Sequence, residues 1–109
     1  MFNIFFDGPW PAIEVRFTAA TEAHLYKHSY ECPEIQPHFV ERILLEADPR
    51  FLYPDHVAGR YVFEGYLLCK PYRVVVEAME EKGLIILFPV SAHRISPKTF
   101  KRRIRQKEC

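Results

Sequence analysis

Histidine is the side chain best suited to proton transfer near neutral pH, because its reference pKa of about 6.5 lets it both accept and donate a proton. The sequence has five of them: His24, His28, His38, His56 and His93. His24 and His28 are spaced to share one face of a helix, and Cys32 follows at the same interval. Two metal ligands could be spaced this way, but no His-Glu-x-x-His arrangement is present and Pro33 interrupts the helix. We therefore predict neither a metal site nor another cofactor.

Histidine and arginine together suit one class of reaction. Cleavage of RNA through its own 2′-hydroxyl requires a base for that hydroxyl, cations that stabilise the phosphorane, and an acid for the leaving oxygen. The predicted acid–base pair is His28 and His93, with His24 as an alternative to His28 on the same helix face. The predicted phosphate contacts are Arg60, Arg73 and Arg94. Each of these side chains would also fit an ordinary surface position.

The dipeptide His93-Arg94 has the most informative position in the chain. It leaves the end of an apolar segment, residues 84–90, and precedes Ser96-Pro97, a typical helix start. The backbone is therefore held on both sides, which is what preorganised charge stabilisation requires. This position makes His93 and Arg94 the strongest candidates for chemistry.

Other kinds of active site have less support. Glu64 and Glu77 could form a carboxylate pair if they lay on neighbouring strands, although solvated positions on an outer face are the expected alternative. The chain has no glycine-rich phosphate loop and no Gly-x-Ser-x-Gly sequence, which argues against nucleotide hydrolases and serine hydrolases.

The charge distribution is uneven although the net charge is only +1. Residues 98–109 hold six basic residues and one acidic residue, whereas the rest of the chain has more acidic than basic residues. Such a tail indicates a polyanionic partner, or else a tail that neutralises an acidic protein surface. If the partner is a nucleic acid, we expect its phosphates to be contacted by Lys27, Lys98, Lys101, Arg102 and Arg105.

Hydrophobic periodicity predicts the elements that must position these residues. Residues 13–18 alternate as a strand does, and residues 18–30 and 37–49 have helical character. Residues 51–59 read as a loop, and three strands joined by short connections follow at 60–68, 72–79 and 84–90. The last of these is apolar on both faces, which predicts a central strand, and Pro89 near its end predicts a bulge or the end of pairing.

These elements predict an α+β domain. An N-terminal strand and two helices would pack on an antiparallel sheet of three to four strands, with the helices on one side and a basic C-terminal helix docked through Phe100 and Ile104. Aromatic residues on the strands could stack on bases, but core positions are the expected alternative: Tyr61, Phe63, Tyr66 and Tyr72.

The length of 109 residues fits a single domain over residues 1–109, with residues 12–105 as its compact part. The three cysteines are widely spaced, and the apolar N-terminus is too short for a membrane span or a signal peptide. We therefore expect a cytoplasmic protein with reduced thiols and no contact with a membrane.

The order of motifs resembles a known superfamily. Residues 16–35 (RFTAATEAHLYKHSYECPEI), a helix ending in EADPRF, and the segments GRYVFEG, RVVVEAM and LIILFPVSAHR resemble the small nucleases of the barnase, EndoU, colicin and RelE-like superfamily. They are most similar to BrnT-type toxins of toxin–antitoxin modules and to phage and mobile-element members. BrnT-type chains also carry a Lys-His pair before the second helix, matched here by Lys27-His28. Their Ser-Ala-Arg-Arg run is matched by SAHR, where His93 replaces the first arginine.

The resemblance implies a metal-independent toxin-type endoribonuclease that acts on RNA and is held in check by a cognate antitoxin protein. The family roles would fall on His28 in the first helix, Arg60 and Arg73 on the sheet, and His93 and Arg94 at the last strand. The alternative is a non-catalytic module, derived from a toxin or related to an immunity protein, that binds nucleic acid or another protein.

Overall fold

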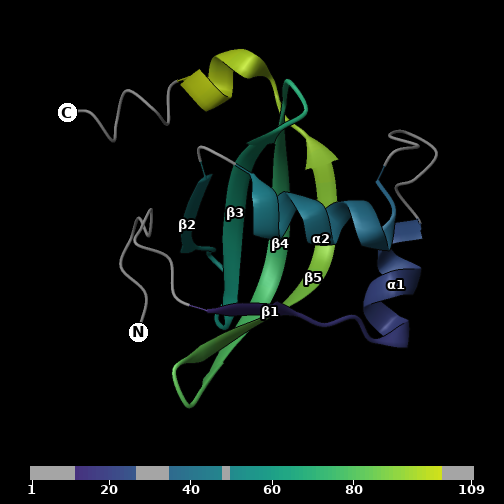
Figure 1. Cartoon of the computed structure of the whole chain (residues 1–109), viewed down its shortest axis with the longest axis vertical. Coiled ribbons are helices and arrows are strands. Elements are labelled where there is room, and N and C mark those ends of the chain that lie inside the picture. The colour runs from purple at the N-terminus through teal and green to yellow at the C-terminus, as the bar shows by residue number, and fades with distance from the viewer. Residues whose placement is uncertain (1–11, 27–34, 48–49, 102–109) are drawn as a thin grey trace.

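A computed structural model describes residues 12–26, 35–47 and 50–101 (Figure 1). The elements in chain order are β1 (Ile13–Val15), α1 (Ala19–Tyr26), α2 (Pro37–Glu46), β2 (Arg50–Pro54), β3 (Arg60–Leu67), β4 (Lys70–Glu81) and β5 (Leu84–Arg94). Residues 97–101 are also helical. The predicted α+β class is confirmed.

The sheet has five strands in the order β1-β5-β4-β3-β2, so it is larger than the predicted three to four strands. Strands β3 to β5 form the predicted antiparallel meander, and β2 extends it by pairing antiparallel with β3. Strand β1 pairs with β5 in parallel, which makes the sheet mixed. The prediction that the last strand is central is confirmed, because β5 lies between β1 and β4. A register shift opposite Pro89, between Val75 and Val76, confirms the predicted irregularity.

The prediction of a loop over residues 51–59 is wrong for its first half. Residues Arg50–Pro54 form β2, whose Leu52 pairs with Phe63 of β3. Phe51 and Leu52 are both buried, one on each face of the sheet, so the segment lacks the alternation that marks a half-buried strand. Because this segment is buried on both faces, its hydrophobic residues do not alternate, and the sequence pattern did not indicate a strand.

Helix α2 covers one face of the sheet, across the front of it in Figure 1. Phe39, Val40, Ile43 and Leu44 form its buried stripe, and Pro37 occupies the first turn, where a missing amide donor costs nothing. At Gly65 of β3, an added Cβ would lie 2.6 Å from the Cβ of Ala47. Glycine at this position therefore lets Ala47, the residue that caps the C-terminal end of α2, pack directly on the strand.

The C-terminal helical segment packs on the opposite face. Its Phe100 is buried and lies 5.8 Å, between ring centroids, from both Phe51 of β2 and Tyr66 of β3. Ser96 caps the segment by accepting a hydrogen bond from the Thr99 amide at 3.1 Å. The predicted cap and the role of Phe100 are confirmed, whereas the placement of all helices on one side is wrong. Ile104 lies outside the described residues.

Among the predicted stacking aromatics, Phe63 and Tyr72 belong to the core, and Tyr72 contacts Phe39 edge to face. Tyr61 packs against the core and Tyr66 contacts Phe100. Within the described ranges, no helix is long and apolar enough to cross a membrane.

Candidate functional site

A row of polar residues crosses three neighbouring strands on the face opposite α2. In the sheet register, Glu64 of β3 pairs with Arg73 of β4, and Arg73 pairs with His93 of β5. Each follows a core residue in its strand: Phe63, Tyr72 and Ala92. Because side chains alternate along a strand, all three point away from the core that α2 covers. We call Glu64, Arg73 and His93 the cross-strand row.

Glu64 is the anchor of the row. Its side chain is fully buried, and its Oε2 accepts hydrogen bonds from Nε of Arg73 at 2.9 Å, from Nη2 of Arg73 at 2.5 Å and from the Tyr53 hydroxyl at 3.0 Å. A buried carboxylate needs such compensation, since burial of an unpaired charge is costly. Tyr53 reaches it from β2, so the contact joins three adjacent strands.

Arg73 connects the buried carboxylate to the surface. Its side chain is 29% exposed, and two of its three guanidinium nitrogens bind Glu64. Within the described part of the chain, its Nη1 has no hydrogen-bond partner. A guanidinium fixed at one edge with another edge accessible is preorganised to bind an anion, because little side-chain freedom is lost on binding.

His93 is the exposed end of the row. Cross-strand partners have Cβ atoms roughly 4.5–5.5 Å apart, so its imidazole and the Arg73 guanidinium can reach the same substrate group. The row thus combines a fixed cation with an adjacent, accessible acid–base group.

Arg60 lies on the same face but away from the row. It is the register partner of Glu77, and its Nε lies 3.6 Å from Oε1 of that residue. Both side chains are exposed by more than a third, so this ion pair is weak and solvent-screened. Arg60 and Glu64 are four positions apart on β3, or about 13 Å at the usual rise per residue. The two glutamates weighed as a carboxylate pair are consequently each paired with an arginine instead.

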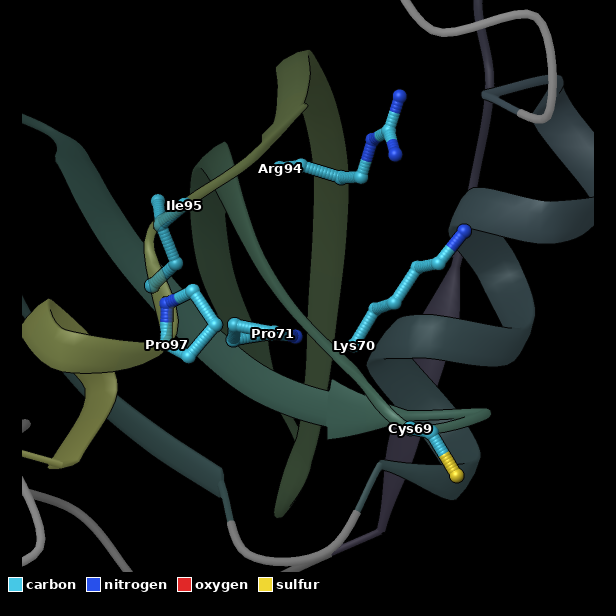
Figure 2. Close-up of a pocket in the computed structure, with 6 residues that line it drawn as sticks. All are labelled: Cys69, Lys70, Pro71, Arg94, Ile95 and Pro97. Atoms are coloured by element: carbon cyan, nitrogen blue, oxygen red, sulfur yellow. The ribbon is translucent and has the colours of Figure 1, made fainter.

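Arg94 lies on the other face from His93, because it is the register partner of the core residue Tyr72. It lines a pocket of about 330 Å³ where the ends of β4 and β5 meet the C-terminal helical segment (Figure 2). The lining residues are Cys69, Lys70, Pro71, Arg94, Ile95 and Pro97. We call this the Lys70–Arg94 pocket.

The remaining predicted residues lie outside the row. Lys98 and Lys101 are exposed on the C-terminal helical segment. Lys27, His28, Arg102 and Arg105 lie outside the described residues. No three or more His, Cys, Asp or Glu side chains within residues 12–26, 35–47 and 50–101 are grouped so that they could hold a metal ion.

Sequence reasoning missed Tyr53 and Lys70 as parts of these sites, and its expectation of a solvated outer-face position for Glu64 is wrong, because Glu64 is buried. Tyr53 was assigned to a loop and Lys70 to a turn. The one available signal was the position of Glu64 between Phe63 and Gly65 in an otherwise apolar strand, which suggests a buried charge that needs a cationic partner.

A scan against protein-family models and a search of curated proteins returned no match for this chain.

Proposed function

We propose that this protein is a small, metal-independent endoribonuclease of the toxin type, within the barnase, EndoU, colicin and RelE-like superfamily. The observation that carries the proposal is the pairing of Arg73 with His93 beside a buried carboxylate that fixes the arginine. This gives two of the three functions that 2′-hydroxyl attack requires, a cation for the phosphorane and an acid for the leaving oxygen.

The reaction follows from these roles. A base removes the proton of the 2′-hydroxyl, whose oxygen attacks the adjacent phosphorus while Arg73 donates hydrogen bonds to a phosphate oxygen. The bond from phosphorus to the 5′-oxygen breaks, and protonated His93 gives its proton to that oxygen. The products are a 2′,3′-cyclic phosphate and a 5′-hydroxyl. His28, the other member of the predicted acid–base pair, is proposed as the base.

Product chemistry tests the proposal directly. The substrate is an oligodeoxynucleotide with one ribonucleotide, and the control is the same oligonucleotide with deoxyribose throughout. We expect cleavage at the ribonucleotide alone, in the presence of EDTA, with a 2′,3′-cyclic phosphate end identified by mass spectrometry. Cleavage of the all-deoxy control, or a linear 3′-phosphate without a cyclic precursor, would contradict 2′-hydroxyl attack.

A matched pair of histidine variants tests the assignment. His93→Ala removes the proposed acid, whereas His56→Ala removes an exposed imidazole in the loop between β2 and β3. We expect the first to lose cleavage and the second to keep it. Equal loss in both would point to a contaminating nuclease or to a non-specific effect of charge.

The alternative function is a non-catalytic module that binds nucleic acid or another protein. It is supported by the exposed cations Lys70, Arg94, Lys98 and Lys101, and by the fact that Arg60 and Arg73 both pair with carboxylates. It predicts salt-dependent RNA binding with no cyclic-phosphate product. RNA as substrate, a cognate antitoxin as protein partner and a cytoplasmic location belong to the proposed nuclease function.

A further inference from the structure

The four candidate stacking aromatics on β3 and β4 differ in their accessibility. Phe63 and Tyr72 are buried in the core and Tyr61 packs against it, so these three rings stabilise the fold. Tyr66 is 37% exposed and is not part of the core cluster. Of the four, Tyr66 therefore has the ring that a base from solution can reach.

Tyr66 lies on the same face of the sheet as the cross-strand row. It follows Glu64 by two residues on β3, and its register partner Pro71 precedes Arg73 by two residues on β4. Because side chains alternate along a strand, Tyr66 and Arg73 are diagonal neighbours on one face. Diagonal neighbours are about 7–8 Å apart, a distance that one nucleotide spans between its base and its phosphate.

The Tyr66 ring is held in place by its neighbours. The Phe100 ring lies 5.8 Å away between centroids, at an interplanar angle of 33°, and Phe100 is itself buried beside Phe51. In the described part of the chain the Tyr66 hydroxyl makes no hydrogen bond, so the ring contacts orient the side chain. A ring fixed in this way loses little freedom when a planar group stacks on it, which favours binding.

Cations accompany this ring. Arg73 presents its guanidinium beside Tyr66, and the segment that carries Phe100 against this face also carries Lys98 and Lys101. Both lysines are exposed, and neither has an ion-pair partner within the described ranges. Exposed aromatic rings among cations are the features by which proteins bind single-stranded nucleic acid, so a nucleotide is the ligand that fits this face.

The geometry of the reaction indicates which nucleotide meets the ring. The attacking 2′-oxygen and the leaving 5′-oxygen lie roughly in line, on opposite sides of the phosphorus. His93 on β5 is the proposed acid for the leaving oxygen, and β3 lies on the other side of β4 from β5. The nucleotide with the 2′-hydroxyl therefore extends from Arg73 toward β3, where Tyr66 lies.

We propose that Tyr66 stacks on the base of the nucleotide that supplies the attacking 2′-hydroxyl, and that the substrate is therefore single-stranded RNA. The inference rests on the proposed endoribonuclease function, because Arg73 and His93 define where the scissile phosphate binds. Stacking on a side chain needs a base that is free of its own stack, which a single strand provides and a duplex does not. Because every base has a π-face, discrimination among bases at this position is weak.

Binding is measured by fluorescence anisotropy with a short fluorescent 2′-O-methyl oligoribonucleotide, which cannot be cleaved through the 2′-oxygen. Tyr66→Leu removes the ring but keeps an apolar side chain against Phe100, whereas Tyr66→Phe keeps the ring. Met79→Ala is the matched control, because it removes another exposed apolar side chain near the opposite end of β4. Thermal melting of each variant checks that it is folded.

Loss of stacking on one aromatic ring weakens binding by about 5- to 150-fold, so Tyr66→Leu should bind at least about fivefold more weakly than the wild type. Tyr66→Phe should bind within about twofold of the wild type because the ring remains, and so should Met79→Ala. Wild-type affinity in Tyr66→Leu would overturn the stacking role. An equal loss in Tyr66→Phe or in Met79→Ala would overturn it as well.

A change in the substrate tests the same contact without altering the protein. The substrate is the oligodeoxynucleotide with one ribonucleotide, in which either the ribonucleotide or the deoxynucleotide after it lacks its base. Without the ribonucleotide base, kcat/KM of the wild type should fall at least about fivefold, whereas that of Tyr66→Leu should stay nearly the same. An equal fall in both proteins, or a fall that depends on Tyr66 only at the following nucleotide, would overturn the proposal.

The two proposals fail separately. RNA binding that depends on the Tyr66 ring, without cleavage of unmodified RNA, would overturn the nuclease function but not the stacking. Cleavage through the 2′-hydroxyl that is indifferent to the ring would overturn the stacking alone. Equal cleavage of the one-ribonucleotide substrate as a single strand and in a duplex would overturn the assignment of single-stranded RNA.

Discussion

Arg73 donates two hydrogen bonds to one oxygen of the buried Glu64 carboxylate, from Nε at 2.9 Å and from Nη2 at 2.5 Å. The two residues are direct register partners on β3 and β4. The contact therefore has two consequences that can be measured apart: it compensates a buried charge, and it fixes the guanidinium that we propose contacts the scissile phosphate.

Glu64→Gln tests the first consequence. The substitution keeps the volume but leaves Arg73 facing a neutral amide, and loss of one partner of a largely buried pair should lower the free energy of unfolding by about 2–4 kcal/mol. Urea unfolding followed by circular dichroism measures this change. Glu77→Gln, in the exposed pair with Arg60, is the control and should cost about 1 kcal/mol or less. Equal costs in the two variants would show that burial of Glu64 does not matter.

Arg73→Lys tests the second consequence. Lysine keeps the positive charge near Glu64, but its single ammonium cannot bind that carboxylate at two points and also present a further fixed donor. Removal of a preorganised donor typically costs 10²–10³ in kcat, so cleavage should fall by about that factor with little change in KM. Single-turnover kinetics on the one-ribonucleotide substrate give both values. A variant with a raised KM and normal kcat would make Arg73 a binding residue instead.

Tyr53→Phe tests whether Tyr53 of β2 helps to position the cross-strand row. The variant removes the hydroxyl that donates to Glu64 at 3.0 Å, and a hydrogen bond to a charged acceptor contributes about 1.5–3 kcal/mol. We expect destabilisation in that range together with a smaller loss of cleavage than Arg73→Lys causes. Wild-type stability in the variant would mean that water replaces the hydroxyl.

Gly65→Ala tests the contact between α2 and β3. The new Cβ would lie 2.6 Å from the Cβ of Ala47 and 2.7 Å from Cε1 of Phe63, so α2 must shift. Overpacking of this kind costs about 1–3 kcal/mol, which differential scanning calorimetry would show as a lower Tm. The second-site change Ala47→Gly should recover part of the loss, and a Tm that falls further in the double variant would argue against this specific clash.

The turn at Leu68 and Cys69 offers a stabilising prediction. Leu68→Asn together with Cys69→Gly places residues that accept positive φ at both positions, which should raise the free energy of unfolding by about 1–2 kcal/mol. Urea unfolding measures the gain. We also expect RNA binding to be unchanged or weaker, since the substitutions relax the turn without adding a contact. An unchanged stability would indicate that the backbone at these positions is not strained.

The hydrophobic pattern along the sequence was sufficient to predict much of the fold. The alternation and short connections of residues 60–94 gave the antiparallel meander, and the apolar faces of the last strand gave its central position. The parallel pairing of β1 with β5 was not predictable, because a three-residue strand leaves no signal of its partner. Phe100 was recognised as a docking residue, yet no periodicity states which face of a sheet a terminal helix will cover.

The candidate site was predictable by residue type more than by arrangement. Arg73 and His93 were selected separately, and their pairing depends on a register that the bulge opposite Pro89 sets. A bulge shifts the alternation, so the faces of His93 and Arg94 cannot be counted forward from the start of β5. The role of Glu64 required knowledge of burial, since the same residue in a half-exposed strand would be a solvated surface charge.

The pairing of β1 with β5 has a consequence for the order of folding. Strand β5 lies between β1 and β4 in the sheet, so β1 cannot pair until a strand that follows all the other strands in the described sequence has been synthesised. Until residues 84–94 leave the ribosome, β1 lacks its partner and the cross-strand row lacks His93. Closure of such long-range contacts is slow compared with hairpin formation. A nascent chain would therefore acquire the proposed activity only after residues 84–94 have been synthesised.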